Sequence, residues 1–416
     1  MAAALAANFA LLVGTQSLHP LTPARPASSA LGSLAGVGAL TPPPGAMTSG
    51  GGTAVVWGAV LRAVEWEREA ERIGLPREEA TVVVSGAAAA AYPVVGSCVL
   101  LGLFFFFSRL ASVVAALMLM SSAVAFCVAF GPGVGALAQH LLGRRRARAT
   151  VGVFLGEERS LADNLTLAAA LCVAGGWLLT GSWILGDLLG AAVVVSFVSF
   201  VHLPNLRVAA ALCLFLFAYD FFWVFLSERY FGQNVMVQVA TQRPGNPVTQ
   251  AAEALNIAVP ASVPRELELP VKLVFPRDVF ADPWGRTGDF TFLGLGDMAL
   301  PGLLVALGRF EDLRRQGPRP VARAGARRAG PLGRGRAVLP STYAGSALAG
   351  YSTGLALALA ASLLSASAQP ALIYIAPLTL GGLAARARSR GELAALWARA
   401  PPAPAPAAPD APAPPA

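Results

Sequence analysis

The stretch LCLFLFAYDFFWVFL, residues 212–226, contains a single charged residue, Asp220. A second stretch, FTFLGLGDMALPGLLVAL at residues 290–307, contains Asp297 as its only charge. Both stretches lie in apolar segments near the length that a membrane-crossing helix requires. A carboxylate in hydrocarbon is costly, so an acidic residue within a span predicts a functional site. Two such residues on consecutive spans predict that they share one site.

The composition of the chain is that of a membrane protein. Of its 416 residues, 55% are hydrophobic and only 13% are charged, which is unusual for a soluble domain. The net charge is +8, and arginine supplies nearly all the positive charge because Lys272 is the only lysine. Arginine-rich loops in a membrane protein favour a topology signal over a nucleic-acid surface, so we expect no nucleic-acid partner.

Apolar runs predict an all-α polytopic membrane protein with nine transmembrane helices. We place the first span in residues 2–15, in the apolar stretch near Thr53–Val64, or partly in both. The remaining eight spans are expected at roughly 88–107, 110–131, 165–181, 184–203, 208–226, 290–308, 343–368 and 370–385. The chain then divides into an N-terminal arm with the first span (1–87), spans two to five (88–203), a catalytic region with spans six to nine (204–400), and a Pro/Ala tail (401–416).

Arginine clusters predict the orientation of this bundle. They follow the third span at residues 144–148, fill the loop 309–342 after the seventh span, and follow the last span at residues 386–399. An even number of spans separates the three clusters, so they share one side, which the positive-inside rule makes cytosolic. The loop 227–289 and the N-terminus are then lumenal, and the C-terminus is cytosolic.

Helical geometry predicts that the two aspartates lie at one depth in the membrane. Asp220 precedes Ser227 by seven residues, and Asp297 follows Phe290 by seven residues. At the helical rise of about 1.5 Å per residue, each carboxyl lies about 10 Å below the lumenal edge, and two consecutive antiparallel helices place them at the same depth. Two carboxyls this close in a low-dielectric site share a proton. The ionised partner can then take a proton from water while the protonated partner polarises a peptide carbonyl, as in aspartic proteases.

Residues beside the aspartates fit such a site. Gly294 and Gly296 remove side chains where another backbone must approach, and Pro301 deprives the Asp297 carbonyl of its helical partner. Tyr219 supplies a hydroxyl next to Asp220. The aspartate pair by itself fits a protease and a proton-coupled transporter about equally well, and a non-proteolytic scaffold is a third alternative.

Cysteine and histidine give no reason to expect a metal or another cofactor. The four cysteines, at positions 98, 127, 172 and 213, fall in apolar spans and are expected to be small core residues. The chain has no HExxH sequence and no clustered His/Cys set. We therefore predict no metal site.

Three short motifs give the chain a resemblance to the presenilin and signal peptide peptidase superfamily of intramembrane aspartyl proteases. They are Tyr219-Asp220 in the sixth span, Gly294-Leu295-Gly296-Asp297 in the seventh, and Pro370-Ala371-Leu372 at the ninth. Longer strings resemble the signal peptide peptidase side: YDFFWVF, NVMVQVAT, LPVKLVFP, LGLGDMALPG and QPALIYIAP. The segments WLLTGSWILGD, FVHLPNLRV and SERYFGQNVMVQVATQRPGNPV are most similar to the signal peptide peptidase-like three branch.

The resemblance covers roughly residues 85–395 and implies roles for individual residues. Asp220 and Asp297 would be the catalytic pair, Tyr219, Gly294, Leu295 and Gly296 would shape the site, and Gln369, Pro370, Ala371 and Leu372 would meet the substrate. The β-prone run Leu273–Phe275 is expected to pair with an extended substrate. Implied partners are the lipid bilayer and transmembrane helices of type II proteins or signal-peptide remnants, and a homo-oligomer is an open alternative.

The resemblance also points to the Golgi, the endoplasmic reticulum or the endosome. The chain departs from the family pattern in its N-terminal arm, in the Arg/Gly/Pro-rich linker 311–340, and in the lack of a dilysine retrieval signal in the tail. These departures leave the first span and the compartment undecided.

Overall fold

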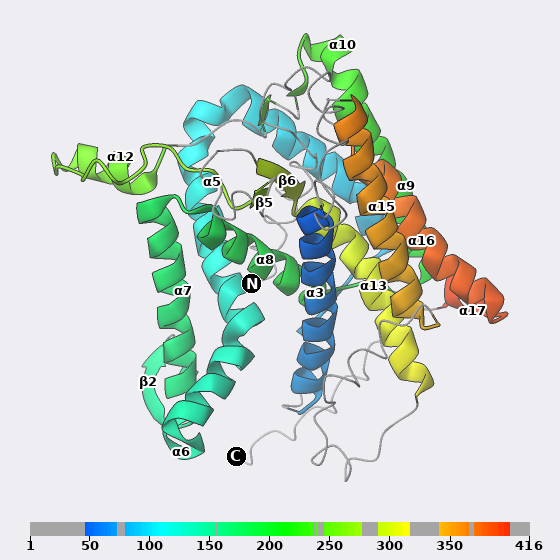
Figure 1. Cartoon of the computed structure of the whole chain (residues 1–416), viewed down its shortest axis with the longest axis horizontal. Coiled ribbons are helices and arrows are strands. Elements are labelled where there is room, and N and C mark those ends of the chain that lie inside the picture. The colour runs from blue at the N-terminus through cyan, green and yellow to red at the C-terminus, as the bar shows by residue number, and fades with distance from the viewer. Residues whose placement is uncertain are drawn as a thin grey trace, which may run out of the picture.

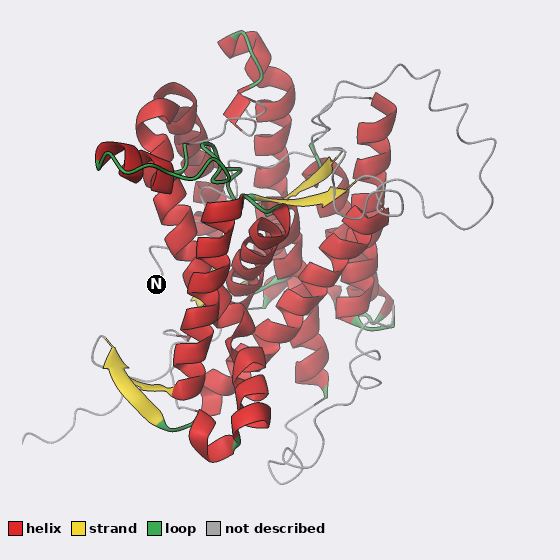
Figure 2. Ribbon diagram, turned by 60° about the vertical axis from the view of Figure 1, so that its left-hand side comes forward, coloured by secondary structure: helices red, strands yellow, loops and turns green. Residues whose placement is uncertain are grey.

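Helices make up most of the part of the chain that the structure describes, and the strands in that part form three small two-stranded sheets (Figure 2). The computed structural model describes residues 46–72, 80–154, 157–235, 238–239, 245–276, 290–316, 341–365 and 370–399. The long helices run between two ends of the molecule, with β2 at one end and β5 and β6 beside the upper end of α3 (Figure 1). This arrangement agrees with the predicted helical membrane bundle.

Six helical segments of the described residues are long and apolar enough to cross a membrane. They are Gly86–Phe106, Val113–Leu142, Leu161–Thr180, Trp183–Phe200, Leu206–Phe231 and Tyr343–Ser362. The first two belong to one element, α5 (Gly86–Leu142), which has a kink at Phe106. The others are carried by α7 (Leu161–Thr180), α8 (Trp183–Phe200), the series α9 (Leu206–Phe221), η1 (Phe222–Leu226) and α10 (Ser227–Phe231), and α15 (Tyr343–Ser365).

Three further long helices do not meet that criterion of length and apolarity. They are α3 (Ala46–Arg72), α13 (Gly296–Arg315) and α16 (Leu372–Ser389). The nine-span prediction requires all three to cross as well, and it remains a prediction. The apolar stretch near Thr53–Val64 lies within α3, which continues beyond it to Arg72. Residues 2–15, the other candidate for the first span, lie outside the described residues.

Side-chain caps explain where two helices begin. We predicted a start at residue 165 for α7, but the helix begins at Leu161. The reason is a capping box, in which the Ser160 hydroxyl accepts from the Asp163 N–H at 3.2 Å while the Asp163 carboxylate accepts from the Ser160 N–H at 3.1 Å. Asn205 caps α9 in a similar way, accepting from the Val208 N–H at 2.8 Å.

Short elements connect the long helices. Strands β1 (Val82–Val83) and β4 (Val201–His202) pair in parallel, and β2 (Thr150–Phe154) pairs antiparallel with β3 (Glu157–Ser160). Strands β5 (Lys272–Pro276) and β6 (Phe290–Gly294) form an antiparallel pair. Further short helices are α6 (Arg144–Ala147), α12 (Pro247–Ala254) and α17 (Leu393–Ala398).

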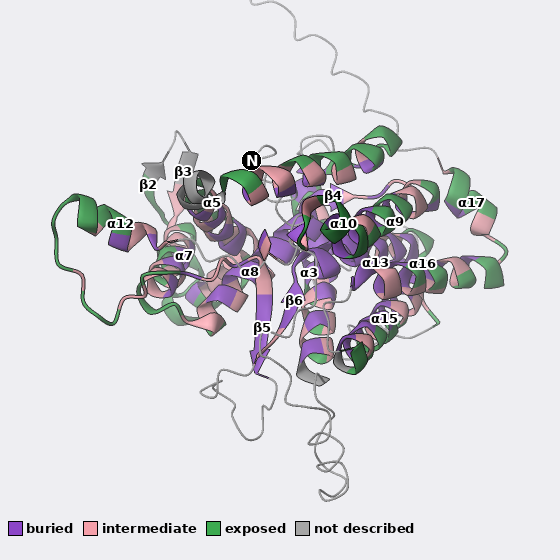
Figure 3. Ribbon diagram, turned by 90° about the horizontal axis from the view of Figure 1, so that it is seen from above, coloured by how far each residue is buried: buried purple, intermediate pink, exposed green. Residues whose placement is uncertain are grey.

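Helix α13 is the centre of the bundle. Every residue from Gly296 to Gly308 is buried, and α13 packs against α3, α8, α15 and α16. Buried residues accordingly gather around α3, α8 and α13 (Figure 3). Helices α5 and α7 carry large exposed apolar side chains, including Phe105, Met120 and Leu171. In a membrane protein such side chains face lipid, so α5 and α7 form an outer layer.

The prediction that all four cysteines are core residues is wrong for two of them. Cys213 on α9 is buried and Cys127 is half-buried, whereas Cys98 and Cys172 are exposed on α5 and α7. An apolar span does not reveal from its sequence which of its faces meets lipid. All four thiols are free.

Candidate active site

Asp220 lies near the end of α9, where the helix changes its winding. The residue is fully buried, and the π-helix η1 begins two positions later at Phe222. Side chains bond the carbonyls of this irregular turn: the Ser227 hydroxyl donates to the Trp223 carbonyl at 2.6 Å, and the Asn234 amide donates to the Val224 carbonyl at 2.8 Å. π-Helical turns of this kind occur frequently at functional sites.

Asp297 is the second residue of α13 and is also fully buried. We predicted a helix from Phe290 onward, and this is wrong because residues 290–294 form strand β6. The strand pairs with β5 over its whole length, so tertiary pairing decides the conformation of a short apolar run that fits either state. The depth estimated from helical rise therefore does not apply to Asp297. Its place in the first turn of α13 puts the carboxylate near the positive end of the helix dipole.

The structure brings the two predicted catalytic carboxylates together. Asp220 and Asp297 interact electrostatically, and none of their four carboxylate oxygens has a hydrogen-bond partner among the described residues. The backbone N–H of Leu372 faces Asp220 but does not reach full hydrogen-bond geometry. Because nearly all buried polar groups in folded proteins are paired, two unpaired buried carboxylates indicate a site that binds another molecule.

The Pro-Ala-Leu motif lies beside this pair. Pro370, Ala371 and Leu372 are buried, and α16 begins at Leu372. Leu372 is the first residue of α16, so its N–H has no partner within that helix, which explains why it can face Asp220. Gln369, the fourth residue expected to meet the substrate, lies outside the described residues.

Two tyrosines flank the carboxylates, and only one was predicted. Tyr219 is buried beside Asp220, as expected from the sequence. Tyr351, on α15, is fully buried and interacts electrostatically with Asp297. Neither hydroxyl has a hydrogen-bond partner among the described residues. The sequence offered one indication of Tyr351: it is a tyrosine within a predicted span and lies between Gly350 and Gly354.

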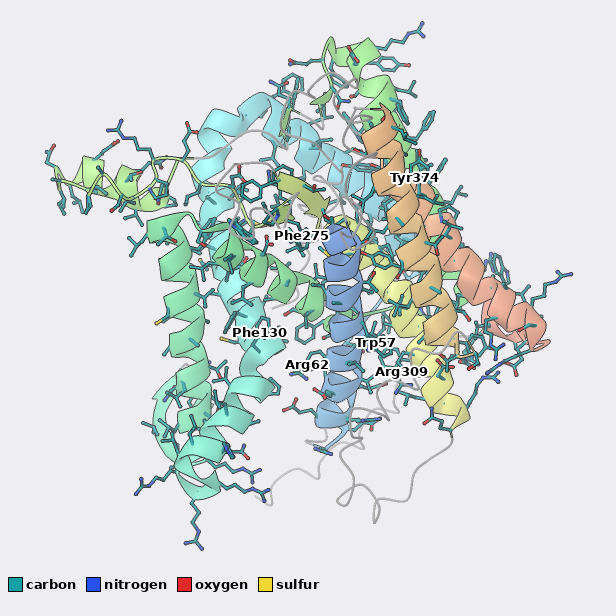
Figure 4. The ribbon with its side chains drawn as sticks, in the orientation of Figure 1. Trp57, Arg62, Phe130, Phe275, Arg309 and Tyr374 are labelled. Atoms are coloured by element: carbon teal, nitrogen blue, oxygen red, sulfur yellow. The ribbon has the colours of Figure 1, made fainter. Side chains whose placement is uncertain are left out.

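Helix α3 forms a wall of the site through two glycines. A Cβ on Gly52 would lie 2.6 Å from Leu293 Cδ2 and 3.2 Å from the Tyr351 hydroxyl. A Cβ on Gly51 would lie 2.7 Å from Phe275 Cε1, and Phe275 lies at the upper end of α3 (Figure 4). The hairpin of β5 and β6 can therefore approach α3 closely only because both positions lack side chains.

A small apolar pocket of about 10 Å³, partly open to the surroundings, lies between α9, α13 and α16. It is adjacent to both carboxylates, because its lining includes the turn before Asp220 and the turn after Asp297. The lining residues are Leu212, Cys213, Leu216, Leu300, Pro301, Leu304, Leu372 and Ala376. Such a lining suits an apolar side chain or lipid chain rather than a polar ligand.

The β-prone run Leu273–Phe275 is indeed a strand, the middle of β5. It pairs with β6 in the register Leu273 to Leu293, Val274 to Phe292 and Phe275 to Thr291. One residue that the sequence did not single out holds the outer side of this strand. The carboxylate of Asp187, on α8, accepts from the Val274 N–H at 2.8 Å.

The chain matches the signal peptide peptidase family over residues 76–403. It is 44% identical to signal peptide peptidase-like 1 of Oryza sativa subsp. japonica over 238 residues, which cover 56% of this chain and 61% of the relative. It is 42% identical to signal peptide peptidase-like 1 of Arabidopsis thaliana over 237 residues, with the same two shares. It is 33% identical to signal peptide peptidase-like 4 of Oryza sativa subsp. japonica over 217 residues, 52% of this chain and 32% of the relative.

These matches span at most about three-fifths of the length of those relatives. No solved structure matches the chain. The finer assignment to the signal peptide peptidase-like three branch stays a prediction. The match over residues 76–403 covers most of the 416 residues and includes all three motifs. The chain therefore belongs to the signal peptide peptidase family.

Proposed function

We propose that this protein is an intramembrane aspartyl endopeptidase in which Asp220 and Asp297 activate water against a peptide bond. The observation that carries the proposal is the pair itself: two fully buried carboxylates that interact with each other and lack partners among the described residues. Leaving such a group unpaired costs about 1–3 kcal/mol, and more when the group is charged. A purely structural role gives no reason for the fold to carry this free-energy cost at two neighbouring residues.

Proton sharing gives the two carboxyls complementary roles. One is ionised and takes a proton from water as the water oxygen attacks the peptide carbonyl carbon, while the protonated one donates to the carbonyl oxygen. The resulting tetrahedral diol collapses when a proton moves to the amide nitrogen and the C–N bond breaks. The products are a carboxyl group and an amine. The hydroxyls of Tyr219 and Tyr351 are donors placed to stabilise charge in this step.

A substrate helix must unwind before its peptide bond is accessible, and an extended segment can be held by strand addition. The ladder of β5 and β6 decides which edge is open. The Leu295 N–H donates to the Val271 carbonyl at 3.2 Å, which makes these two residues a hydrogen-bonded pair. Backbone groups alternate in direction along an antiparallel ladder. The outward-facing residues are therefore Lys272, Val274 and Pro276 on β5, and Phe290, Phe292 and Gly294 on β6.

The outer edge of β5 is closed to a further strand. Its Val274 N–H already donates to Asp187, and Pro276 has no N–H to offer. The outer edge of β6 has an N–H at each of its outward positions. We therefore favour β6 as the strand that receives the substrate, with Leu273–Phe275 as the inner strand that supports β6 rather than the one that pairs with the substrate.

The small apolar pocket next to the aspartates would present an apolar surface to the substrate. This agrees with a transmembrane-helix substrate, whose residues are mainly apolar. Family resemblance and the predicted topology favour substrates of type II orientation or signal-peptide remnants, and a location in the Golgi, endoplasmic reticulum or endosome. The same topology puts the N-terminus in the lumen and the C-terminus in the cytosol, with a homo-oligomer as an open alternative.

The test is cleavage of a tagged type II membrane reporter co-expressed with the protein. We expect release of the lumenal fragment with the wild type, and loss of release with Asp220→Ala and with Asp297→Ala. Asp163→Ala is the matched control, because it removes a carboxylate from the exposed cap of α7 and should leave release intact. Release that persists in both aspartate variants would contradict the proposal and favour a scaffold. Absence of cleavage together with aspartate-dependent proton flux in liposomes would favour the transporter.

A further inference from the structure

We propose that Asp187, through its hydrogen bond to the Val274 N–H, is a positioning residue that sets which peptide bond of the substrate reaches the two aspartates. The inference rests on the proposed function. It assigns a role in choosing the cleavage position to a carboxylate that belongs to none of the three motifs. Three contacts of α8 and the hairpin support it.

The first contact is the bond between Asp187 and β5. Asp187 Oδ1 accepts from the Val274 N–H at 2.8 Å, across 87 residues of sequence. A hydrogen bond of this length from a backbone N–H to a carboxyl oxygen fixes the direction as well as the distance between the two groups. Asp187 is the fifth residue of α8, and the N-cap position belongs to Ser182, so the carboxylate does not cap its own helix. Its hydrogen bond is to the strand.

The second contact lies one turn further along the same face of α8. A Cβ on Gly190 would lie 3.3 Å from Leu273 Cδ2 and 3.2 Å from Leu295 Cδ2. The glycine thus lets α8 approach β5 and the end of β6 closely. Asp187 and Gly190 together fix the hairpin on a helix that is itself largely buried. The bond of Asp187 sets the position of β5 along α8, and Gly190 sets the distance between them.

The third contact carries that position to the catalytic pair. The Leu295 N–H donates to the Val271 carbonyl, so the ladder continues past β6 to a residue two positions before Asp297. A displacement of β5 therefore moves β6 and the start of α13 relative to Asp220. Strand residues are spaced about 3.3 Å apart, so a shift of this size is enough to present a neighbouring peptide bond. The position of the cut is then a property of the hairpin as well as of the aspartates.

The experiment uses the full chain in liposomes with a transmembrane peptide substrate. Product ends are identified by mass spectrometry, and kcat and KM are measured. With Asp187→Ala we expect new product ends one or more residues from the wild-type cut, and kcat/KM lower by up to about tenfold, the usual effect of losing one hydrogen bond. Asp187→Asn keeps an acceptor oxygen and should restore the wild-type cut.

A reciprocal variant removes the donor instead of the acceptor. Val274→Pro deletes the N–H that faces Asp187, and the β5–β6 ladder survives because that N–H faces away from β6. We expect the same new product ends as with Asp187→Ala, and no further change in the double variant, because both changes remove one interaction. Asp163→Ala is the matched control and should leave the product ends unchanged.

The outcomes separate this inference from the proposed function. One outcome is that Asp187→Ala and Val274→Pro both give the wild-type product ends, with activity lowered only as far as the amount of folded protein is lowered. That outcome would overturn the positioning role and leave the proposed protease function standing. New ends in one variant alone would also overturn it, because the role is assigned to the bond between the two residues. A wild-type protein that cleaves nothing would remove the proposed function, and the inference with it.

Discussion

The Arg62 side chain donates from Nε to the Val128 carbonyl at 3.0 Å, and this is the carbonyl that Pro132 leaves without a helical N–H. Arg62 belongs to α3 and is 8% exposed, and Val128 belongs to α5. Arg62 lies between the two helices (Figure 4). A helix that contains proline at membrane depth has its free carbonyl satisfied by a side chain of a neighbouring helix. The same contact joins the outer layer of the bundle to its core.

Removal of Arg62 should destabilise the protein through that carbonyl. For Arg62→Leu we expect the free energy of unfolding to fall by about 1–3 kcal/mol, because a buried acceptor loses its partner. In a Pro132→Ala background the N–H of residue 132 can serve Val128, so the same change should cost less. Denaturant unfolding in detergent micelles measures both. Arg68→Leu, at an exposed position of α3, is the control. Equal costs in the two backgrounds would contradict this account.

Close packing of α15 on α16 should not tolerate a methyl group. A Cβ on Gly350 would lie 2.1 Å from the Leu378 carbonyl oxygen, and a Cβ on Gly382 would lie 2.4 Å from that of Ser346. Gly350→Ala must therefore displace α16, and with it the Leu372 N–H that faces Asp220. We expect loss of proteolytic activity and a lower melting temperature, although alanine favours helices over glycine by about 1 kcal/mol. Gly381→Ala is the control, because no atom lies within 4 Å of its Cβ.

Asp312 should stabilise the start of α15 from a distance in sequence. Its Oδ1 and Oδ2 accept from the N–H groups of Tyr343 and Ala344, each at 2.9 Å. Asp312→Ala removes this cap, and we expect a loss of about 0.5–2 kcal/mol in unfolding free energy. Asp312→Asn retains one acceptor oxygen and should lose less. Thermal melts measure both variants, and Glu253→Ala, at an exposed position, is the control. Melting temperatures of both Asp312 variants equal to that of the wild type would contradict the cap.

The Tyr351 hydroxyl should contribute to catalysis more than to folding. Tyr351→Phe keeps the ring that fills a fully buried site and removes only the group that interacts with Asp297. We expect kcat to fall on the order of 10- to 100-fold, because a donor in a low-dielectric site stabilises developing charge. The melting temperature should change little. Tyr230→Phe, at a residue that is 70% exposed, is the control. Unchanged kcat in Tyr351→Phe would exclude this role.

The sequence was most informative about features that follow from the free-energy cost of placing polar groups in lipid. Long apolar runs predicted most helices of the bundle, because lipid leaves few other backbone conformations open. The same reasoning identified Asp220 and Asp297 as unusual, and the structure brings them together. In the same way, the β-prone composition of Leu273–Phe275 predicted a strand that the structure contains.

Features that depend on contacts between distant segments were not predictable. Residues 290–294 are apolar enough for a helix, and their pairing with β5 makes them a strand. Asp187 was one carboxylate among several near span ends until Val274 was found to donate to it. Tyr351 required the packing of α15 against the aspartates, and η1 is a change of winding with no composition signal of its own. Each of these is decided by a partner far away in the chain.

Gly51 and Gly52 make α3 part of the enclosure around the aspartates, although α3 carries no motif residue and precedes the family match, which begins at residue 76. A chain that retained all three motifs but lacked this helix would leave Leu293, Phe275 and the Tyr351 hydroxyl without their cover. It would pass a motif search as an active protease and yet be a pseudoenzyme. A search for active relatives should therefore require, besides the aspartates, a helix before the family match that carries small residues at the positions of Gly51 and Gly52.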